Sequence, residues 1–338
     1  MKTIEQIKEE LINFGKRHKA YEEILNSIKG NTLIELFSNI SGNIYWYKEN
    51  KKKEIEFNSI FGNDLVIEDG VLLYNCTGLE SVTIPDSVTT IGEGAFEGCI
   101  ELTSITIPNS VTTLENFAFA YCTGLTSVTI PNSVTSIGEF AFYACSELTS
   151  IELPNSITSI GKFAFTFCKR LKTITIPNSV TSISEWTFSD CTELTSVTIP
   201  DSVTTIWHYA FENCRTLESI VIPNSVTSIR DNTFCGCSGL TSITIPDSVT
   251  SIGYDAFYGC SALTSITIPN SVISIGGGAF HYCTGLTSIT IPNSVTHIEN
   301  FAFAYCKRLE SIIIPDSVTY IGDDAFYKCK PNLKIIRI

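Results

Sequence analysis

The sequence predicts a mainly β solenoid of stacked repeats, and three residue series predict it. Cysteine recurs every 23 residues from Cys76 to Cys329. Proline recurs at the same interval from Pro85 to Pro315, and so does phenylalanine from Phe96 to Phe326. Residue types that share one period of about 20–29 residues indicate a solenoid in which each repeat forms one coil. We therefore expect eleven 23-residue repeats over residues 76–330, rather than the two domains that a length of 338 residues would suggest.

The first part of the chain, residues 1–75, is expected to form a small helical N-terminal cap followed by lead-in strands. Thr3 and Gln6 fit a helix capping box, and apolar residues then recur on one helical face at Ile4, Ile7, Leu11 and Ile12. Residues 54–60 and 65–74 alternate as strands do, with a tight turn at 68–70 in the second of them. The helical segment is interpreted either as a cap over the end of the solenoid core or as a separate partner-binding module.

Each coil is expected to contain two short strands. In one coil, Ser127–Ile130 alternates between polar and apolar residues, which is typical of a half-buried strand. Pro131 cannot donate to a strand ladder and ends it, and Asn132 with the following serine favours a turn. Val134–Ile137 is a second extended stretch, after which a Phe-Ala-Phe segment returns the chain. A lone coil buries too little apolar surface to fold, so the coils must share one core.

The chain is expected to end in an edge strand over residues 331–338. The residues Lys334 and Arg337 flank its apolar run, and charges there discourage pairing with another sheet edge.

The repeat resembles a known family. Its pattern Leu-x-x-Ile-x-Ile-Pro-x-Ser-Val-x-x-Ile-Gly-x-x-Ala-Phe-x-x-Cys is similar to the BspA-type leucine-rich repeats, and it extends from residue 79 to about residue 330. The resemblance implies a curved leucine-rich-repeat solenoid with a parallel sheet on the concave face. It also implies a family found on the surfaces of bacteria and parasitic protists and linked to adhesion and host-protein binding.

Composition excludes several classes of protein. The chain is 43% hydrophobic with a mean hydropathy of +0.19, which is incompatible with a disordered chain. No apolar run approaches the ~18 residues of a membrane span, so we expect no membrane insertion. The 35 acidic residues outnumber the 22 basic ones, leaving a net charge of −13, and this balance predicts no nucleic-acid partner.

Two residue columns suggest cofactors but are better explained structurally. Successive cysteines of the repeat should lie about 5 Å apart and point the same way, and such a ladder cannot converge on a metal as zinc ligands do. We expect a reduced, buried column. Cys235 lies outside that series and is a candidate reactive thiol. The Asn or Asp after each proline fits a turn better than a calcium site. We expect no metal and no cofactor.

The candidate binding residues are aromatic and lie around the Ala-Phe pair of each coil. The structural interpretation is that these rings cover the convex edge of the solenoid and pack along the stack. The alternative is a partner-binding aromatic strip, because contiguous exposed apolar surface marks interaction sites. Acidic residues line the same region and would suit a basic partner. The strip comprises Phe117, Phe140, Phe163, Trp186, Tyr209, Tyr121, Tyr143, Tyr258, Tyr282 and Tyr305.

No enzyme is predicted, because no nucleophile accompanies a histidine and a carboxylate outside the repeat pattern. The main hypothesis is a monomeric, non-enzymatic binding protein that presents an extended surface for adhesin-like contact with a macromolecule, either a protein or a glycan. The alternative is an intracellular scaffold or effector whose helical head and solenoid engage different partners. Acidic residues Glu5, Glu9 and Glu10 interrupt the apolar stretch of an export signal. The sequence thus favours the cytoplasm, whereas the family resemblance implies a surface or secreted location.

Overall fold

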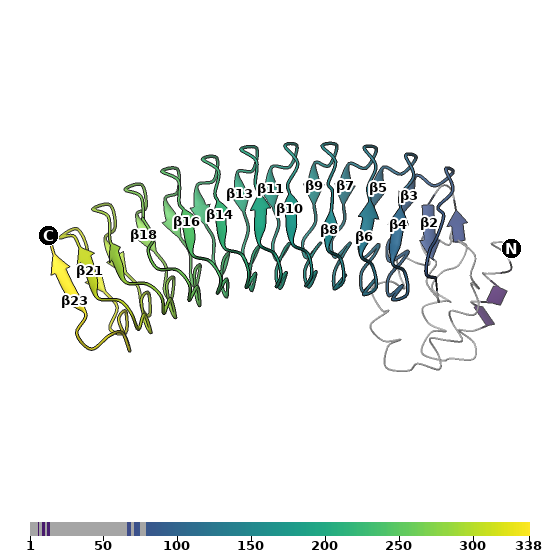
Figure 1. The fold of residues 1–338 in the computed structure, drawn as a ribbon. Coiled ribbons are helices and arrows are strands. Elements are labelled where there is room, and N and C mark those ends of the chain that lie inside the picture. The colour runs from purple at the N-terminus through teal and green to yellow at the C-terminus, as the bar shows by residue number, and fades with distance from the viewer. Residues whose placement is uncertain (1–5, 7–8, 11, 14–65, 69–70, 75–78) are drawn as a thin grey trace.

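A computed structural model describes residues 6, 9–10, 12–13, 66–68, 71–74 and 79–338. Within this part the chain winds into coils that stack side by side in a curved rod (Figure 1). The predicted mainly β, parallel-sheet solenoid is confirmed. The predicted helical cap and the predicted strand over residues 54–60 lie outside the described residues, apart from isolated positions near the N-terminus. The predicted strands near residues 65–74 are present as β1 (Val66–Glu68) and β2 (Val71–Tyr74), which pair antiparallel.

Two series of short strands run along the rod. The first series precedes the proline of its coil, except in the last strand, which no proline follows, and the residues before Pro269 form no strand. It comprises β4 (Ser104–Thr106), β6 (Ser127–Thr129), β8 (Ser150–Ile151), β10 (Thr173–Thr175), β12 (Ser196–Thr198), β14 (Ser219–Val221), β16 (Ser242–Thr244), β19 (Ser288–Thr290), β21 (Ser311–Ile314) and β23 (Lys334–Arg337). The second series follows the turn and comprises β3 (Thr90–Ile91), β5 (Thr113–Leu114), β7 (Ser136–Ile137), β9 (Ser159–Ile160), β11 (Ser182–Ile183), β13 (Thr205–Ile206), β15 (Ser228–Ile229), β17 (Ser251–Ile252), β18 (Ser274–Ile275), β20 (His297–Ile298) and β22 (Tyr320–Ile321).

The register of these strands follows the 23-residue period. Ser127 of β6 pairs with Ser150 of β8, and Thr173 of β10 with Ser196 of β12, all in parallel. In β6 the side chain of Val128 is buried while its neighbours on either side are exposed, as expected of a half-buried strand. In most of these strands one residue therefore enters the core, and hydroxyl side chains make up most of the outer face.

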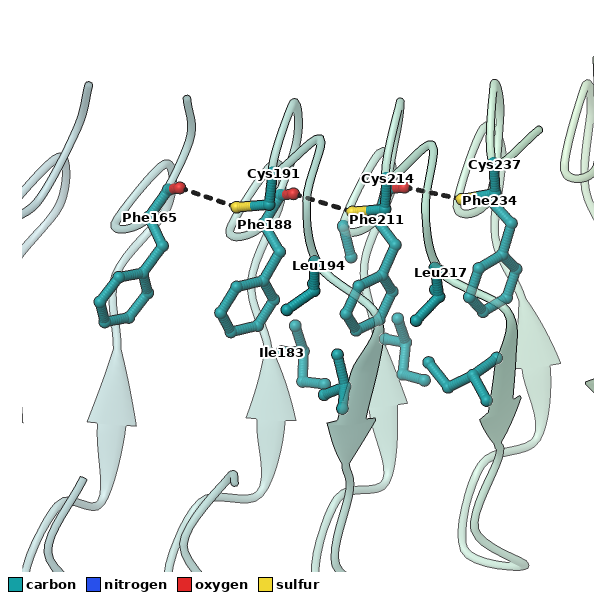
Figure 2. Packing of buried hydrophobic residues seen from close by; sticks show 14 of the residues in the cluster. Phe165, Ile183, Phe188, Cys191, Leu194, Phe211, Cys214, Leu217, Phe234 and Cys237 are labelled. Carbon is teal, nitrogen blue, oxygen red and sulfur yellow. Dashed lines mark hydrogen bonds between the residues drawn. The ribbon is translucent and has the colours of Figure 1, made fainter. Parts of the chain in front are cut away.

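The core is a continuous column of stacked phenylalanines. All rings from Phe96 to Phe303 have no exposed surface, and successive ring centroids lie 5.1–5.8 Å apart as far as Phe326. Figure 2 shows four of these rings above leucine and isoleucine side chains of the same coils. Offset stacking at this spacing is favourable beyond the burial itself, so the phenylalanines couple each coil to both of its neighbours.

The cysteine column runs beside the phenylalanines and ties neighbouring coils together. The thiol of Cys214 donates to the backbone carbonyl of Phe188 at 3.2 Å, and that of Cys237 donates to Phe211 at 3.0 Å (Figure 2). Cysteines from Cys122 to Cys329 repeat this contact with the coil before, and the cysteines in the described part of the chain are free rather than disulfide-bonded. Burial raises the pKa of the Cys214 thiol well above its ordinary value, so the column consists of neutral donors.

One contact between coils departs from the regular pattern. At the junction between β12–β13 and β14–β15, neither strand series is paired, and this is the only such junction among the coils that the structure describes. The backbone contacts of the phenylalanine segment persist there, with Phe211 N–H donating to Thr233 O at 3.0 Å. Side chains also bridge the junction. The guanidinium carbon of Arg230 lies 4.2 Å from the ring centroid of Trp207, and Nδ1 of His208 lies 3.5 Å from Oδ2 of Asp231.

Candidate binding surface

Two positions adopt a left-handed backbone in all but the last of the described coils, one before and one after the core phenylalanine. The non-glycine residues at both positions have φ between 50° and 61°. We call these positions column 1 and column 2. Column 1 comprises Gly94, Phe117, Phe140, Phe163, Trp186, Tyr209, Asn232, Asp255, Gly278 and Phe301, and column 2 comprises Gly98, Tyr121, Ala144, Phe167, Asp190, Asn213, Gly236, Gly259, Tyr282, Tyr305 and Lys328.

Aromatic residues are unfavourable in this left-handed backbone conformation. A left-handed conformation costs a residue with a Cβ roughly 1–2 kcal/mol, and only Gly, Asn and Asp adopt it routinely. The chain uses these easier residues in other coils, with Asn232 and Gly278 in column 1 and Gly236 in column 2. Coils therefore form without rings at these positions. The aromatic side chains are placed there at a conformational cost, and such outliers concentrate at functional sites.

The N-terminal rings of column 1 form an unbroken stack. Centroids of Phe117 and Phe140 lie 4.7 Å apart, those of Phe163 and Trp186 4.9 Å, and those of Trp186 and Tyr209 4.4 Å, with planes within 4–8° of parallel. A third column, between columns 1 and 2, adds Tyr143, whose ring meets those of Phe140, Tyr121 and Phe167 edge to face. We call the three columns together the aromatic edge, and these eight rings the N-terminal stack.

A second group of rings lies further along the same edge. Tyr282 and Tyr305 stack at 4.4 Å, and Tyr258 meets Tyr282 edge to face at 5.5 Å. His281 packs against Tyr282 at 4.6 Å, and the ammonium of Lys328 lies 5.5 Å from the ring centroid of Tyr305. The two groups are separated by the coil of Asn232, which has no ring in any of the three columns.

The rings present their edges, not their faces, to solvent. Each inner ring of the N-terminal stack is covered on both faces by its neighbours, and Phe140, Phe163 and Trp186 are half-buried. The stack spacing of 4.4–4.9 Å is shorter than the 5.1 Å or more in the core column. The rings thus pack closely along the stack, as the first interpretation expects. Their placement on the convex edge stays a prediction.

The structure gathers the predicted strip into two clusters. Seven of its ten residues lie in the N-terminal stack, and Tyr258, Tyr282 and Tyr305 lie in the second group. The binding role of these residues stays a prediction. Phe301, which is 41% exposed, and the Trp207–Arg230 pair were not predicted. The position two residues before column 1 is glycine in most coils, and two neighbouring coils have Trp207 and Arg230 there instead. This replacement was the sequence signal for the pair.

Carboxylates surround the aromatic edge and raise one another's pKa. Burial and then the charge of Glu93 raise the pKa of Glu115. Burial is also the main cause at Glu212, with Asp190 adding to the rise. The pKa of Asp255 is raised to about 6, mainly by burial and further by Asp231. The edge is consequently an apolar ribbon in an electronegative setting. In the described part of the chain, no group of three or more His, Cys, Asp or Glu residues is arranged to hold a metal ion.

Cys235 lies in the middle column of the aromatic edge, where it is half-buried. Burial, followed by the charges of Glu212 and Asp255, raises its pKa to about 12. Because only the thiolate is nucleophilic, we expect negligible alkylation of Cys235 by iodoacetamide at pH 7.5 in the folded protein. The rate should rise about tenfold per pH unit above that. Mass spectrometry of the Cys235 peptide measures it, and rapid labelling at pH 7.5 would show that the thiol is activated instead.

Comparisons with known proteins place this geometry among bacterial repeat proteins. A family model described as the BspA type leucine rich repeat region matches residues 66–191, 113–240 and 227–338. A leucine-rich repeat protein from Bacteroides ovatus is 28% identical, with 81% of this chain and 97% of that chain covered and a TM-score of 0.51. A leucine rich cell surface protein from Faecalibacterium prausnitzii is 32% identical, with 81% and 92% covered and a TM-score of 0.52. Curated proteins yield no match. The described residues contain no helix suited to crossing a membrane.

Proposed function

This chain belongs to the BspA-type leucine-rich repeat family, and from that premise we propose that it is a non-enzymatic, adhesin-like binding protein whose aromatic edge contacts a partner protein. The leucine-rich-repeat solenoid itself suggests protein–protein interaction. It holds a long surface rigid, because every coil is fixed by its neighbours. A rigid surface loses little conformational freedom on binding, which favours affinity.

The observation that carries the proposal is the choice of aromatic residues at left-handed positions. Trp186 and Tyr209 occupy column 1, where the coil next along uses Asn232 without any change in backbone conformation. Tyr, Trp and Phe are enriched in protein interfaces, and Trp and Tyr dominate binding hot spots. The coil fold does not require these half-buried rings, and a binding role would explain why the chain has them.

The arrangement of the rings supports a protein partner over a glycan or a nucleic acid. Sugars pack their C–H groups on exposed ring faces, and single-stranded nucleic acids stack their bases on such faces. In the N-terminal stack these faces are covered, as those of Phe140 and Phe163 show. The net charge of −13 also opposes phosphate binding. Ring edges remain available, and the side chains and backbone of a partner protein can pack against them.

We place the protein at a cell surface, acting as a monomer. The support is its 32% identity to a structure described as a cell surface protein. The competing proposal, an intracellular scaffold whose N-terminal segment and solenoid engage different partners, rests on the acidic residues that interrupt an export signal. Fractionation of the native organism separates the two proposals, because a purely cytosolic pool would contradict the adhesin-like role.

The double variant Trp186→Asn/Tyr209→Asn tests the aromatic edge directly. Asparagine already occupies column 1 at Asn232, so the coils should keep their fold. We expect proteins retained from a cell-surface protein array by the native chain to bind the variant at least tenfold more weakly, since hot-spot residues carry about 2 kcal/mol or more. The matched control is Val221→Thr, which changes a side chain that is 71% exposed on β14. Equal binding by both variants would contradict the proposal.

A further inference from the structure

The carboxylates beside the N-terminal stack are far in excess of the basic groups there. In the coils from Glu93 to Asp231, most of these acidic residues lie one or two positions before column 1. The others lie in the middle column or in column 2. Three basic residues lie among them, and all three are engaged: Lys162 pairs with Glu185 at 2.7 Å, His208 Nδ1 lies 3.5 Å from Asp231 Oδ2, and Arg230 lies over Trp207. The acidic residues are Glu93, Glu97, Glu115, Glu139, Glu185, Asp190, Glu212 and Asp231.

Basic side chains pair with Glu185 and Asp231, but they do not balance the negative charge of the whole set. The side chain of Glu115 is close enough to Glu93, and that of Glu212 to Asp190, for the pairs to raise the pKa of the first member of each. Like charges along one edge repel one another, and a low-dielectric neighbour such as a ring stack strengthens the effect. A positively charged partner would remove this repulsion and gain attraction at the same place, which is electrostatic complementarity.

We propose, building on the function proposed above, that the N-terminal stack binds a lysine- or arginine-rich segment of a partner protein. The apolar parts of that segment lie on the ring edges of Phe140, Phe163 and Trp186, and its cationic groups reach the flanking carboxylates. Long basic side chains suit this arrangement, because their methylene stems cover apolar surface while their charges extend beyond it.

The second group of rings has a cation of its own and is not part of this site. Lys328 lies over Tyr305 and Tyr327 and occupies the cation position there. His281 occupies the middle column, at the position that Glu97 and Glu212 hold in other coils. A basic segment should therefore select the N-terminal stack over the second group.

Two synthetic peptides of about twelve residues serve as probes, one built from Lys-Leu-Ser repeats and the other from Glu-Leu-Ser repeats. Fluorescence anisotropy with the full chain should show binding of the lysine peptide and none of the glutamate peptide. Because exposed charge pairs are screened by salt, raising the ionic strength from about 50 to 300 mM should weaken binding at least tenfold. Equal binding of the two peptides, or no binding of either, would overturn the basic-segment proposal.

Matched charge variants locate the site. Glu139→Gln/Asp190→Asn/Glu212→Gln removes three charges beside the stack, and the asparagine suits the left-handed backbone at position 190. Glu152→Gln/Asp201→Asn/Glu218→Gln removes three exposed charges from the strand and turn surfaces. We expect the first variant to bind the lysine peptide at least tenfold more weakly and the second to differ less than twofold from the native chain. Equal weakening by both would mean attraction to net charge alone and would overturn the proposal.

The ring variant Trp186→Asn/Tyr209→Asn distinguishes failure of the aromatic-edge proposal from failure of the basic-segment proposal. If it abolishes array binding while the edge-charge variant binds as the native chain does, the aromatic edge is the binding surface and the basic-segment proposal fails. If neither variant changes any binding, both proposals fail.

Discussion

Replacing Phe211 by alanine is expected to destabilise the solenoid by about 3–5 kcal/mol and to split its unfolding into two transitions. The ring has no exposed surface and stacks on Phe188 at 5.5 Å and on Phe234 at 5.7 Å. A truncated core phenylalanine loses its transfer free energy and leaves a cavity. In a repeat protein this loss falls on the coupling between neighbouring coils, and here it falls at the junction where neither strand series is paired.

The matched variant is Phe119→Ala, in a coil where both series are paired. Its ring is equally buried and stacks on Phe96 at 5.1 Å and on Phe142 at 5.2 Å, while β5 pairs with β7 and β4 with β6. We expect a similar loss of stability in a single transition. Urea unfolding followed by circular dichroism, with tryptophan fluorescence as a second probe, separates the cases. Identical single transitions for both variants would show that the junction is no weaker than the others.

Removing 23 residues is expected to harm the fold less than removing one. Deletion of residues 125–147 takes out one whole coil and returns every column to register, so the thermal midpoint should stay within about 5 °C of the native value. Deletion of Val128 alone shifts the rest of its coil by one position. Because strand side chains alternate between faces, the slip turns buried residues outward.

We expect the Val128 deletion to cost about 3 kcal/mol or more, because Val128 is 6% exposed and its loss leaves a mispaired strand in the core. Thermal melts by circular dichroism compare the two deletions with the native chain. A stable Val128 deletion beside an unfolded coil deletion would mean that the coil is not the unit of structure.

The coil could be predicted from the sequence, because in the main core columns one residue type recurs every 23 residues. The phenylalanines from Phe96 to Phe326, the described cysteines and the strand before most of the prolines lie where the period places them. What the period could not show is backbone conformation at variable positions. Nothing in Phe140 or Trp186 as residue types indicates a left-handed φ, and only the presence of Asn and Gly elsewhere in the same column hints at it.

The geometry of the candidate site was also beyond sequence reasoning. A column of aromatic residues predicts proximity, but whether the rings show faces or edges depends on rotamers and on the local spacing between coils. The unpaired junction beside Trp207 and Arg230 could not be predicted either, because its phenylalanines and cysteines match those of the other coils.

The central claim is that the rings of column 1 serve recognition and are not needed by the fold. A fivefold variant with asparagine at each ring of the N-terminal stack in column 1 tests it most directly: Phe117, Phe140, Phe163, Trp186 and Tyr209. Each lost ring pair is worth about 0.5–1.5 kcal/mol, and relief of the left-handed backbone offsets roughly 1–2 kcal/mol per residue. We predict an unchanged far-ultraviolet circular dichroism spectrum and a thermal midpoint within about 5 °C of the native chain. Loss of the folded spectrum would show that the rings hold the coils together, and would contradict the account.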